Sequence, residues 1–235
     1  MKSRIIIGLI LLPFGIKAQH YAHTTFWSKI AITTPLSKKW DFQMEYVHRS
    51  QNDYHESKWN PFKRESLEEP RLWFNWRHKN ITVQLNPISY IYSKPLLGNE
   101  KDYFITPNRE WRTAVGLETR QTAAKWIFKE RVQYEYRWLK ILNYGATSRL
   151  RLRGTLQYEI NAKTKAQCFS EIFINTPPHK AKYSYDTQWT LVGISRQISP
   201  KFTMDLGYMR NWRKRVTGVE FDDENALNLG LNFRL

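Results

Sequence analysis

Apolar and polar residues alternate between Ser148 and Ile160. The apolar side chains Leu150, Leu152, Leu156, Tyr158 and Ile160 fall at even positions, and Arg149, Arg151, Arg153, Thr155, Gln157 and Glu159 fall at odd positions. Side chains of a β-strand point alternately to its two faces, whereas a helix would spread these arginines around its circumference. The segment therefore predicts a strand with one apolar face and one charged face.

This predicted strand is long, and similar segments recur along the chain. Strands of globular proteins have about five or six residues, whereas about 9–11 tilted residues cross a bilayer. The pattern predicts strands at residues 26–33, 40–49, 71–77, 81–92, 111–120, 126–138, 148–160, 167–175, 186–197, 202–211 and 224–235. Several of them end in Trp or Tyr, as in the aromatic girdles of membrane barrels.

The connections between these segments alternate between short turns and long loops, which is typical of transmembrane barrels. We therefore expect an all-β fold, an antiparallel up-and-down transmembrane β-barrel of 10–12 strands. Bacterial single-chain barrels have even strand numbers, which selects 10 or 12; we favour 12, with an additional strand near residues 19–25. A soluble lipocalin-like barrel is the rival fold, but it would bury its apolar face inside.

The first 18 residues have the pattern of a secretory signal peptide. Lys2 and Arg4 give the positive start, residues 5–12 give a short apolar run, and Ala18 followed by Gln19 offers a cleavage point. The apolar run is too short for a membrane helix. We expect residues 19–235 to form a single barrel domain in the outer membrane of a Gram-negative bacterium.

The chain carries a formal net charge of +16. Its basic residues are dispersed along the predicted strands and mixed with acids, so we do not expect nucleic acid as a partner. Membrane lipids and the phosphates of lipopolysaccharide are the expected partners, together with the outer-membrane insertion machinery, which would engage the C-terminal strand. Cys168 is the one cysteine, so neither an intrachain disulfide nor a cysteine metal cluster is possible. We expect no cofactor or metal.

The polar face of the predicted strands supplies the candidate functional residues. They are Arg112, Glu118, Arg120, Arg131, Glu135, Arg149, Arg151, Arg153, Glu159, Glu171 and Asp205. Arginines at the bilayer midplane cost about 2–4 kcal/mol each on the lipid face, so they must face the lumen. We expect Arg149, Arg151 and Arg153 to pair with acids of nearby strands, with Glu135 and Glu171 as the first choices. The other expected partners are Glu110, Glu118, Glu159 and Asp205. The network is either structural or part of an anion-binding or anion-selective passage.

An outer-membrane lipid-modifying enzyme, of the lipase or deacylase type, is the alternative function. Such an enzyme needs a serine and a histidine brought together. The candidates are His48, His78 and His179 with Ser50, Ser89, Ser170 or Ser195, but no local signature joins them and Gly-x-Ser-x-Gly is absent. The sequence therefore favours a passive role, either a small porin-like channel or a binding and structural barrel.

Several short motifs resemble a known family. They are Phe26-Trp27, Lys39-Trp40, residues 117–120, the arginine ladder at 149–153, residues 171–175 and Gly207-Tyr208-Met209. Together they make the chain similar, over nearly the whole length after residue 18, to the Gram-negative outer-membrane family catalogued as domain of unknown function 2490. The resemblance implies an outer-membrane barrel and brings no activity or site residues with it.

Overall fold

The computed structural model describes residues 19–139, 145–176, 184–215 and 217–235 and shows an all-β chain. The strands are β1 (Gln19–Pro35), β2 (Trp40–Gln51), β3 (Arg64–His78), β4 (Ile81–Ser93), β5 (Asn108–Ala123), β6 (Trp126–Leu139), β7 (Gly145–Asn161), β8 (Thr164–Thr176), β9 (Tyr185–Ser199), β10 (Phe202–Lys214) and β11 (Glu220–Arg234). A single turn of 3-10 helix, η1 (Glu100–Phe104), interrupts the β4–β5 connection. In the part of the chain described, no helix is long and apolar enough to cross a membrane. The predicted signal peptide lies outside the described residues.

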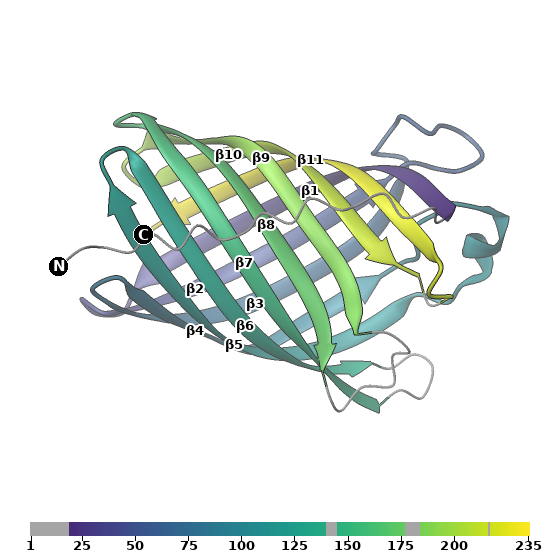
Figure 1. Cartoon of the computed structure of the whole chain (residues 1–235), viewed down its shortest axis with the longest axis horizontal. Coiled ribbons are helices and arrows are strands. Elements are labelled where there is room, and N and C mark those ends of the chain that lie inside the picture. The colour runs from purple at the N-terminus through teal and green to yellow at the C-terminus, as the bar shows by residue number, and fades with distance from the viewer. Residues whose placement is uncertain (1–18, 140–144, 177–183, 216) are drawn as a thin grey trace.

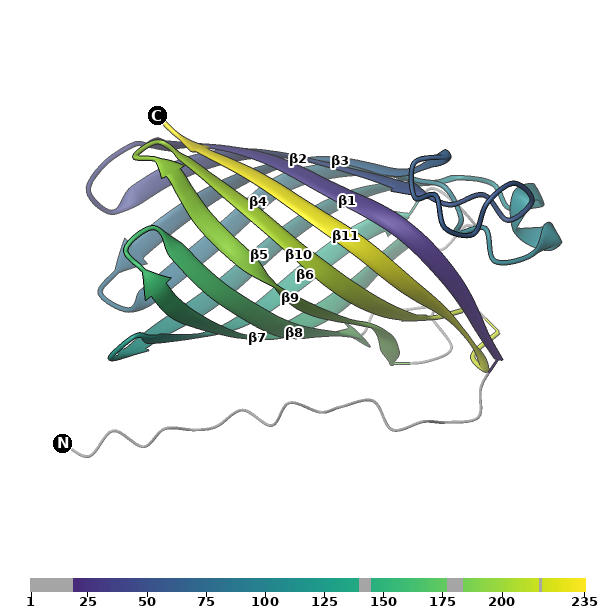
Figure 2. The ribbon, with the colours of Figure 1, turned by 90° about the horizontal axis from the view of Figure 1, so that it is seen from above.

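The strands form one closed barrel in which neighbours along the chain pair antiparallel (Figure 1). The barrel closes where β1 pairs with β11, and this pairing is parallel, with Gln19 beside Glu220 and Thr33 beside Arg234 (Figure 2). The predicted antiparallel barrel of 10–12 strands is confirmed, but the expectation of an even strand number is wrong. Residues 19–25 are the first part of β1 and form no strand of their own, so eleven strands close through a parallel seam.

Some strand boundaries also differ from the sequence prediction. Strand β3 begins at Arg64, whereas the pattern placed residues 51–69 in a loop. The acidic residues Glu65, Glu68 and Glu69 and the following Pro70 hid this beginning, because a run of charges followed by proline is typical of a loop. In the barrel, Glu69 points inward and is buried, while Pro70 is exposed. Glu69 therefore belongs to the lumen.

The two faces of the wall have the predicted polarity. On β7, Arg149 and Arg151 are buried inside the barrel, while Leu152 between Arg151 and Arg153 is 39% exposed. Apolar residues are exposed in the same way around the wall, among them Val115, Val132, Ile194, Leu206 and Leu227. Trp40 and Trp126 lie at the end with short turns, and Trp111 and Trp138, paired across β5 and β6, lie towards the other end. This outer surface is suited to lipid.

We expect Leu152→Arg to lower the free energy of unfolding by about 2–4 kcal/mol, because residue 152 lies near the middle of β7 and its side chain faces outward. Urea unfolding of the protein in lipid vesicles measures this change. Leu152→Ala is the matched control, since it shortens the side chain without adding charge. Equal losses for the two variants would contradict a lipid-facing position.

Candidate functional site

Two buried carboxylates organise the charged side chains inside the barrel. The first is Glu135 on β6, which is 0% exposed. It accepts hydrogen bonds from Arg149 Nη2 at 2.6 Å and from Arg151 Nη1 at 2.7 Å. Arg112 Nη1 lies 3.5 Å away on the other side. One carboxylate thus contacts guanidinium groups from β5 and β7.

The second carboxylate is Glu171 on β8, which is also 0% exposed. It accepts hydrogen bonds from Arg151 Nε at 3.0 Å, Arg153 Nη2 at 2.5 Å and Arg131 Nη2 at 2.9 Å. Arg131 and Arg153 lie directly opposite each other in the β6–β7 ladder, where like charges destabilise a strand pair. Glu171, opposite Arg153 in the next ladder, offsets this repulsion.

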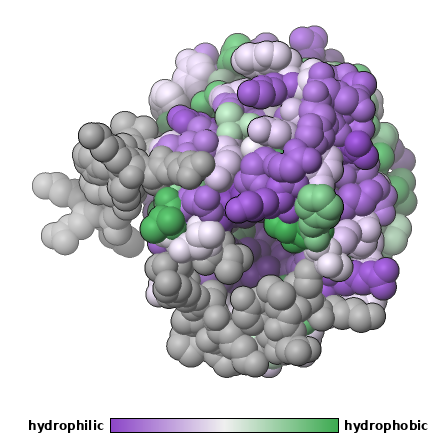
Figure 3. All heavy atoms as spheres, turned by 90° about the vertical axis from the view of Figure 1, so that its right-hand side faces the viewer, coloured by the Kyte–Doolittle hydropathy of each residue, from purple (hydrophilic) through white to green (hydrophobic). Residues whose placement is uncertain are grey.

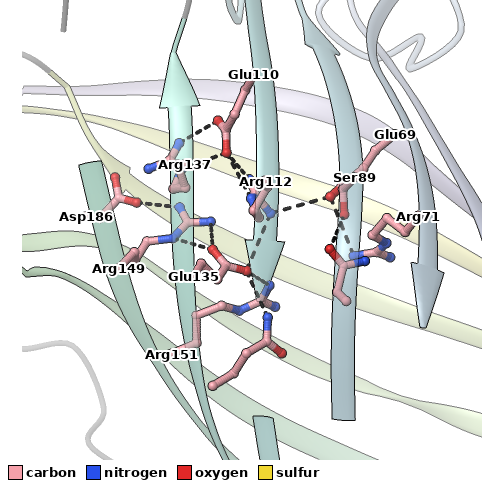
Figure 4. Close-up of polar contacts among 12 residues, drawn as sticks. Glu69, Arg71, Ser89, Glu110, Arg112, Glu135, Arg137, Arg149, Arg151 and Asp186 are labelled. Carbon is pink, nitrogen blue, oxygen red and sulfur yellow. Dashed lines mark hydrogen bonds and ion pairs between the residues drawn. The ribbon is translucent and has the colours of Figure 1, made fainter. Parts of the chain in front are cut away.

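Further ion pairs join the contacts of Glu135 and Glu171 to other charged residues around the wall (Figure 4). They join Glu110 to Arg112 and Arg137 at 2.8 and 2.7 Å, Asp186 to Arg149 at 2.7 Å, Glu69 to Arg112 at 3.4 Å, and Glu45 to Arg71 and Lys29 at 3.0 and 3.7 Å. All these ion pairs together are called the lumen network below. Removing one partner of a buried pair leaves an uncompensated charge and costs about 3–5 kcal/mol. The network therefore fixes how the strands β1–β3 and β5–β9 sit against one another.

The structure brings seven of the eleven predicted residues together in this network: Arg112, Arg131, Glu135, Arg149, Arg151, Arg153 and Glu171. The alternation assigned the face of each residue but carried no information on its height along the barrel. Glu135 and Glu171, the first choices as partners, both contact the arginine ladder, and Asp186 contacts Arg149 as well.

The expectation that Glu110, Glu118, Glu159 and Asp205 pair with the arginine ladder is wrong. Glu110 pairs with Arg112 and Arg137 instead. Glu159 lies six residues beyond Arg153, about 20 Å along the strand, and pairs with Lys165 at 2.9 Å. Asp205 on β10 accepts a hydrogen bond from Asn232 at 2.8 Å. Glu118 lies opposite Arg131 in the β5–β6 ladder, but Arg131 turns to Glu171.

Arg120 is likewise outside the network, because it is exposed near the short turn between β5 and β6. Sequence reasoning also missed members of the site. Asp186 was read as the start of a strand, and Glu69 as part of a loop. Glu69 and Arg71 share the parity of an inward face, so extending the alternation by two residues would have found Glu69.

The opposite side of the lumen is apolar and aromatic. Trp27 on β1, Leu191 on β9, Met209 on β10 and Ala226 on β11 are buried together, and Trp189 packs against them. The Trp27 and Trp189 rings meet edge to face with centroids 5.0 Å apart. The lumen thus has two unlike walls, one charged and one aromatic.

Arg49 on β2 lies where these two walls meet. It is 7% exposed, and its guanidinium carbon lies 3.1 Å from the centroid of the Trp27 ring and 5.4 Å from that of Trp189. The ion pairs of the lumen network leave Arg49 out, and among the described residues its Nε atom has no hydrogen-bond partner. A buried donor without a partner costs about 1–3 kcal/mol, and more when charged. Sequence reasoning placed Arg49 on a polar face but could not foresee this isolation.

A cavity of about 210 Å³ lies between the two walls. Its lining includes the cationic side chains Lys29, Arg49, Arg71, Arg131, Arg151 and Arg153, the carboxylates Glu45 and Glu69, and the rings Trp27, Trp73, Phe169 and Trp189. Six cationic side chains thus face two carboxylates. If Glu135 and Glu171, which contact these arginines, are counted as well, the cationic side chains still outnumber the carboxylates by six to four. The cavity is suited to an anion.

The β4–β5 connection packs into the end of the barrel that carries the long loops. Leu96 and Leu97 are buried, and Gln51 both donates to the Pro95 carbonyl at 2.9 Å and accepts from the Leu97 N–H at 3.0 Å. Asp102 in this connection pairs with Arg215 at 3.0 Å. Most of the described residues seen at this end are hydrophilic, and a hollow lies beside them (Figure 3).

Asp53 in the β2–β3 connection is tied to the same end of the barrel. Tyr103 donates a hydrogen bond to its carboxylate at 2.6 Å, and so does Arg64 Nε, also at 2.6 Å. Burial raises the pKa of Asp53, but these hydrogen bonds outweigh it and hold the pKa well below its ordinary value. The two connections therefore hold each other in place at neutral pH.

Of the histidines proposed for catalysis, the two that the structure describes do not face the lumen. His48 lies on the outer side of β2, where its ring and the carboxylates of Glu65 and Glu68 come within 4.8 Å of one another. This group could hold a metal ion, although Lys94 contacts Glu65 and Tyr46 contacts Glu68, both at 2.8 Å. His78 stacks on Trp76 beside a short turn. The third candidate, His179, lies outside the described residues.

Comparisons with known proteins show the family of the chain and relate its fold to that of a solved porin. The model of the family described as "Protein of unknown function (DUF2490)" matches residues 24–222, so the chain belongs to this family and the resemblance is confirmed. Among solved structures, the chain is similar to the NanC porin, with 13% identity, 91% of this chain and 98% of that chain covered, and a TM-score of 0.54. The siderophore receptor PirA from Pseudomonas aeruginosa matches with 14% identity over 76% of this chain and 32% of that chain, at a TM-score of 0.30. A search of curated protein sequences found no significant match.

We expect Glu171→Gln to lower the free energy of unfolding by about 3–5 kcal/mol, because it leaves three guanidinium groups without their shared carboxylate. Urea unfolding in lipid vesicles, followed by tryptophan fluorescence, measures the loss. Glu159→Gln is the matched control: its pair with Lys165 is about one third exposed on both sides, and the variant should unfold like the wild type. A Glu171→Gln protein as stable as this control would show that the network does not hold the barrel.

Proposed function

We propose that the protein is an outer-membrane barrel that admits small anions through its lumen, as a narrow anion-selective channel. The observation that carries this proposal is the lining of the lumen cavity, where six cationic side chains face two carboxylates. Rings of charged side chains set the selectivity of channels, and arginine and lysine favour anions. Passage then requires only that the anion is held weakly enough to leave.

Membership of the family and the architecture of the barrel support the membrane location. The outer surface is apolar across the middle of the wall and carries tryptophans towards both ends, which is the arrangement that lipid requires. The porin likeness extends to the fold alone. The predicted signal peptide agrees with export.

A structural role of the lumen network is compatible with a channel. Glu135 and Glu171 draw five arginines towards the wall formed by β5–β8, so that this side of the lumen is filled by paired charges. The cavity lies on the other side of these pairs, against Trp27 and Trp189. The paired charges hold the barrel, and the surplus of cations beside them attracts the anion.

In planar bilayers with a gradient of potassium chloride, we expect unitary currents whose reversal potential shows that chloride is preferred over potassium. Arg49→Gln should shift the reversal potential towards zero, because it removes a lumen cation that forms no direct ion pair among the described residues. The control is Arg210→Gln, which removes an exposed arginine that pairs with Asp223 on the outside of the wall.

Correctly folded protein that gives no unitary currents would contradict the channel. Cation-selective currents would contradict the proposed role of the arginines. Equal shifts in the Arg49→Gln and Arg210→Gln proteins would show that the overall charge of the barrel, not the cavity, sets the selectivity.

A further inference from the structure

We infer that the cavity beside Arg49 is a binding site for a small organic carboxylate that carries a flat apolar body, of the aromatic carboxylate class. The inference deepens the proposed function and rests on it in one respect, namely that small anions reach the lumen. It adds that one kind of anion is held there in a defined orientation. Three features of the cavity lead to it: an isolated guanidinium group, free donor atoms next to it, and an aromatic wall.

Arg49 is the first feature. The Trp27 ring stacks on its guanidinium group with 3.1 Å between the guanidinium carbon and the ring centroid. Stacking holds the plane of the group but leaves the donors on its edge unused, and Nε has no partner in the described chain. A guanidinium edge fits a carboxylate through two parallel hydrogen bonds. A stacked and buried arginine of this kind is pre-organised to bind one.

Neighbouring arginines supply more donors. Arg131 and Arg153 both line the cavity, and each directs its Nη2 atom to Glu171. The Nε atoms of both have no partner among the described residues. Because Glu171 already fixes these two side chains, their remaining donors do not have to be ordered when an anion binds.

The aromatic wall decides which class of anion fits. Trp27 and Trp189 meet edge to face, and Phe169 lines the same cavity. A second flat ring can pack on such a wall by stacking or by an edge-to-face contact, and bury its apolar surface there. Chloride or inorganic phosphate would use the arginines and leave the indoles unused. A carboxylate on an aromatic ring uses both walls.

The size of the cavity limits the ligand. Its volume of about 210 Å³ is smaller than the ~300–1,000 Å³ of pockets that take drug-sized molecules. It accommodates a single small ring with its carboxylate and excludes a lipid chain or an oligomer. Benzoate is therefore a suitable probe.

The test is isothermal titration calorimetry on the full-length protein, folded in detergent micelles, with protein-free micelles as the blank. Benzoate should bind saturably with one site per barrel. Acetate, which has the carboxylate alone, and benzamide, which has the ring without the charge, should each bind about tenfold more weakly or not at all. Benzoate and acetate binding equally well would overturn the aromatic class and leave a simple anion site.

Variants locate the site. Arg49→Gln should weaken benzoate binding about tenfold or more, and Arg49→Lys should also weaken it, because a point charge does not reproduce the planar fork. Arg210→Gln, on the outside of the barrel, should bind like the wild type. If a folded Arg49→Lys protein binds benzoate as tightly as the wild type, the role of the guanidinium edge is overturned. The comparison of benzoate, acetate and benzamide on the wild type tests the class of ligand without any variant.

The calorimetry tests the binding site and the bilayer recordings test the channel, so each proposal can be rejected while the other stands. Anion-selective currents without saturable benzoate binding would overturn this inference and leave the channel intact. Saturable benzoate binding without currents would remove the channel and leave a binding barrel.

Discussion

The pairing of buried guanidinium groups with Glu135 and Glu171 is the interaction on which the barrel depends. Arginines on the lipid face would be too costly for the strand, and unpaired arginines inside would be costly as well. The two carboxylates resolve both problems, since each contacts three arginines from strands one or two places away in the sheet. The positions of these two residues along β6 and β8 therefore fix the height at which the lumen is charged.

The same pairing explains why a cavity remains. Paired side chains lie against the wall formed by β5–β8, while the other wall is filled by Trp27, Trp189 and their apolar neighbours. Between these unlike walls, Arg49 stacks on an indole ring and forms no direct ion pair among the described residues. The paired charges of the lumen network thus stabilise the barrel, and the surplus of positive charge beside them can attract an anion.

The period-two alternation was enough to predict the barrel, the outward leucines and the inward arginine ladder, because the face of a strand residue follows from its parity. Parity does not say how far along the barrel a residue lies or which side chains surround it. Glu159 shares the face of Arg153 but lies too far along β7 to join it. The surroundings of Arg49 depend on Trp27 and Trp189, which lie far apart in the sequence. The predicted even number of strands was wrong for a similar reason. The parallel pairing of β1 with β11 arises only when the two ends of the sheet meet, and no local pattern in the sequence encodes it.

Anomalous diffraction tests most directly whether an anion is held beside Arg49 within the lumen. Crystals of the full-length protein grown with bromide in place of chloride would show each bound halide as a peak of anomalous density. We expect a peak within hydrogen-bond distance of the Arg49 guanidinium group, between the arginines and the indole rings. Bromide peaks confined to exposed lysines and arginines, with none in the cavity, would contradict it.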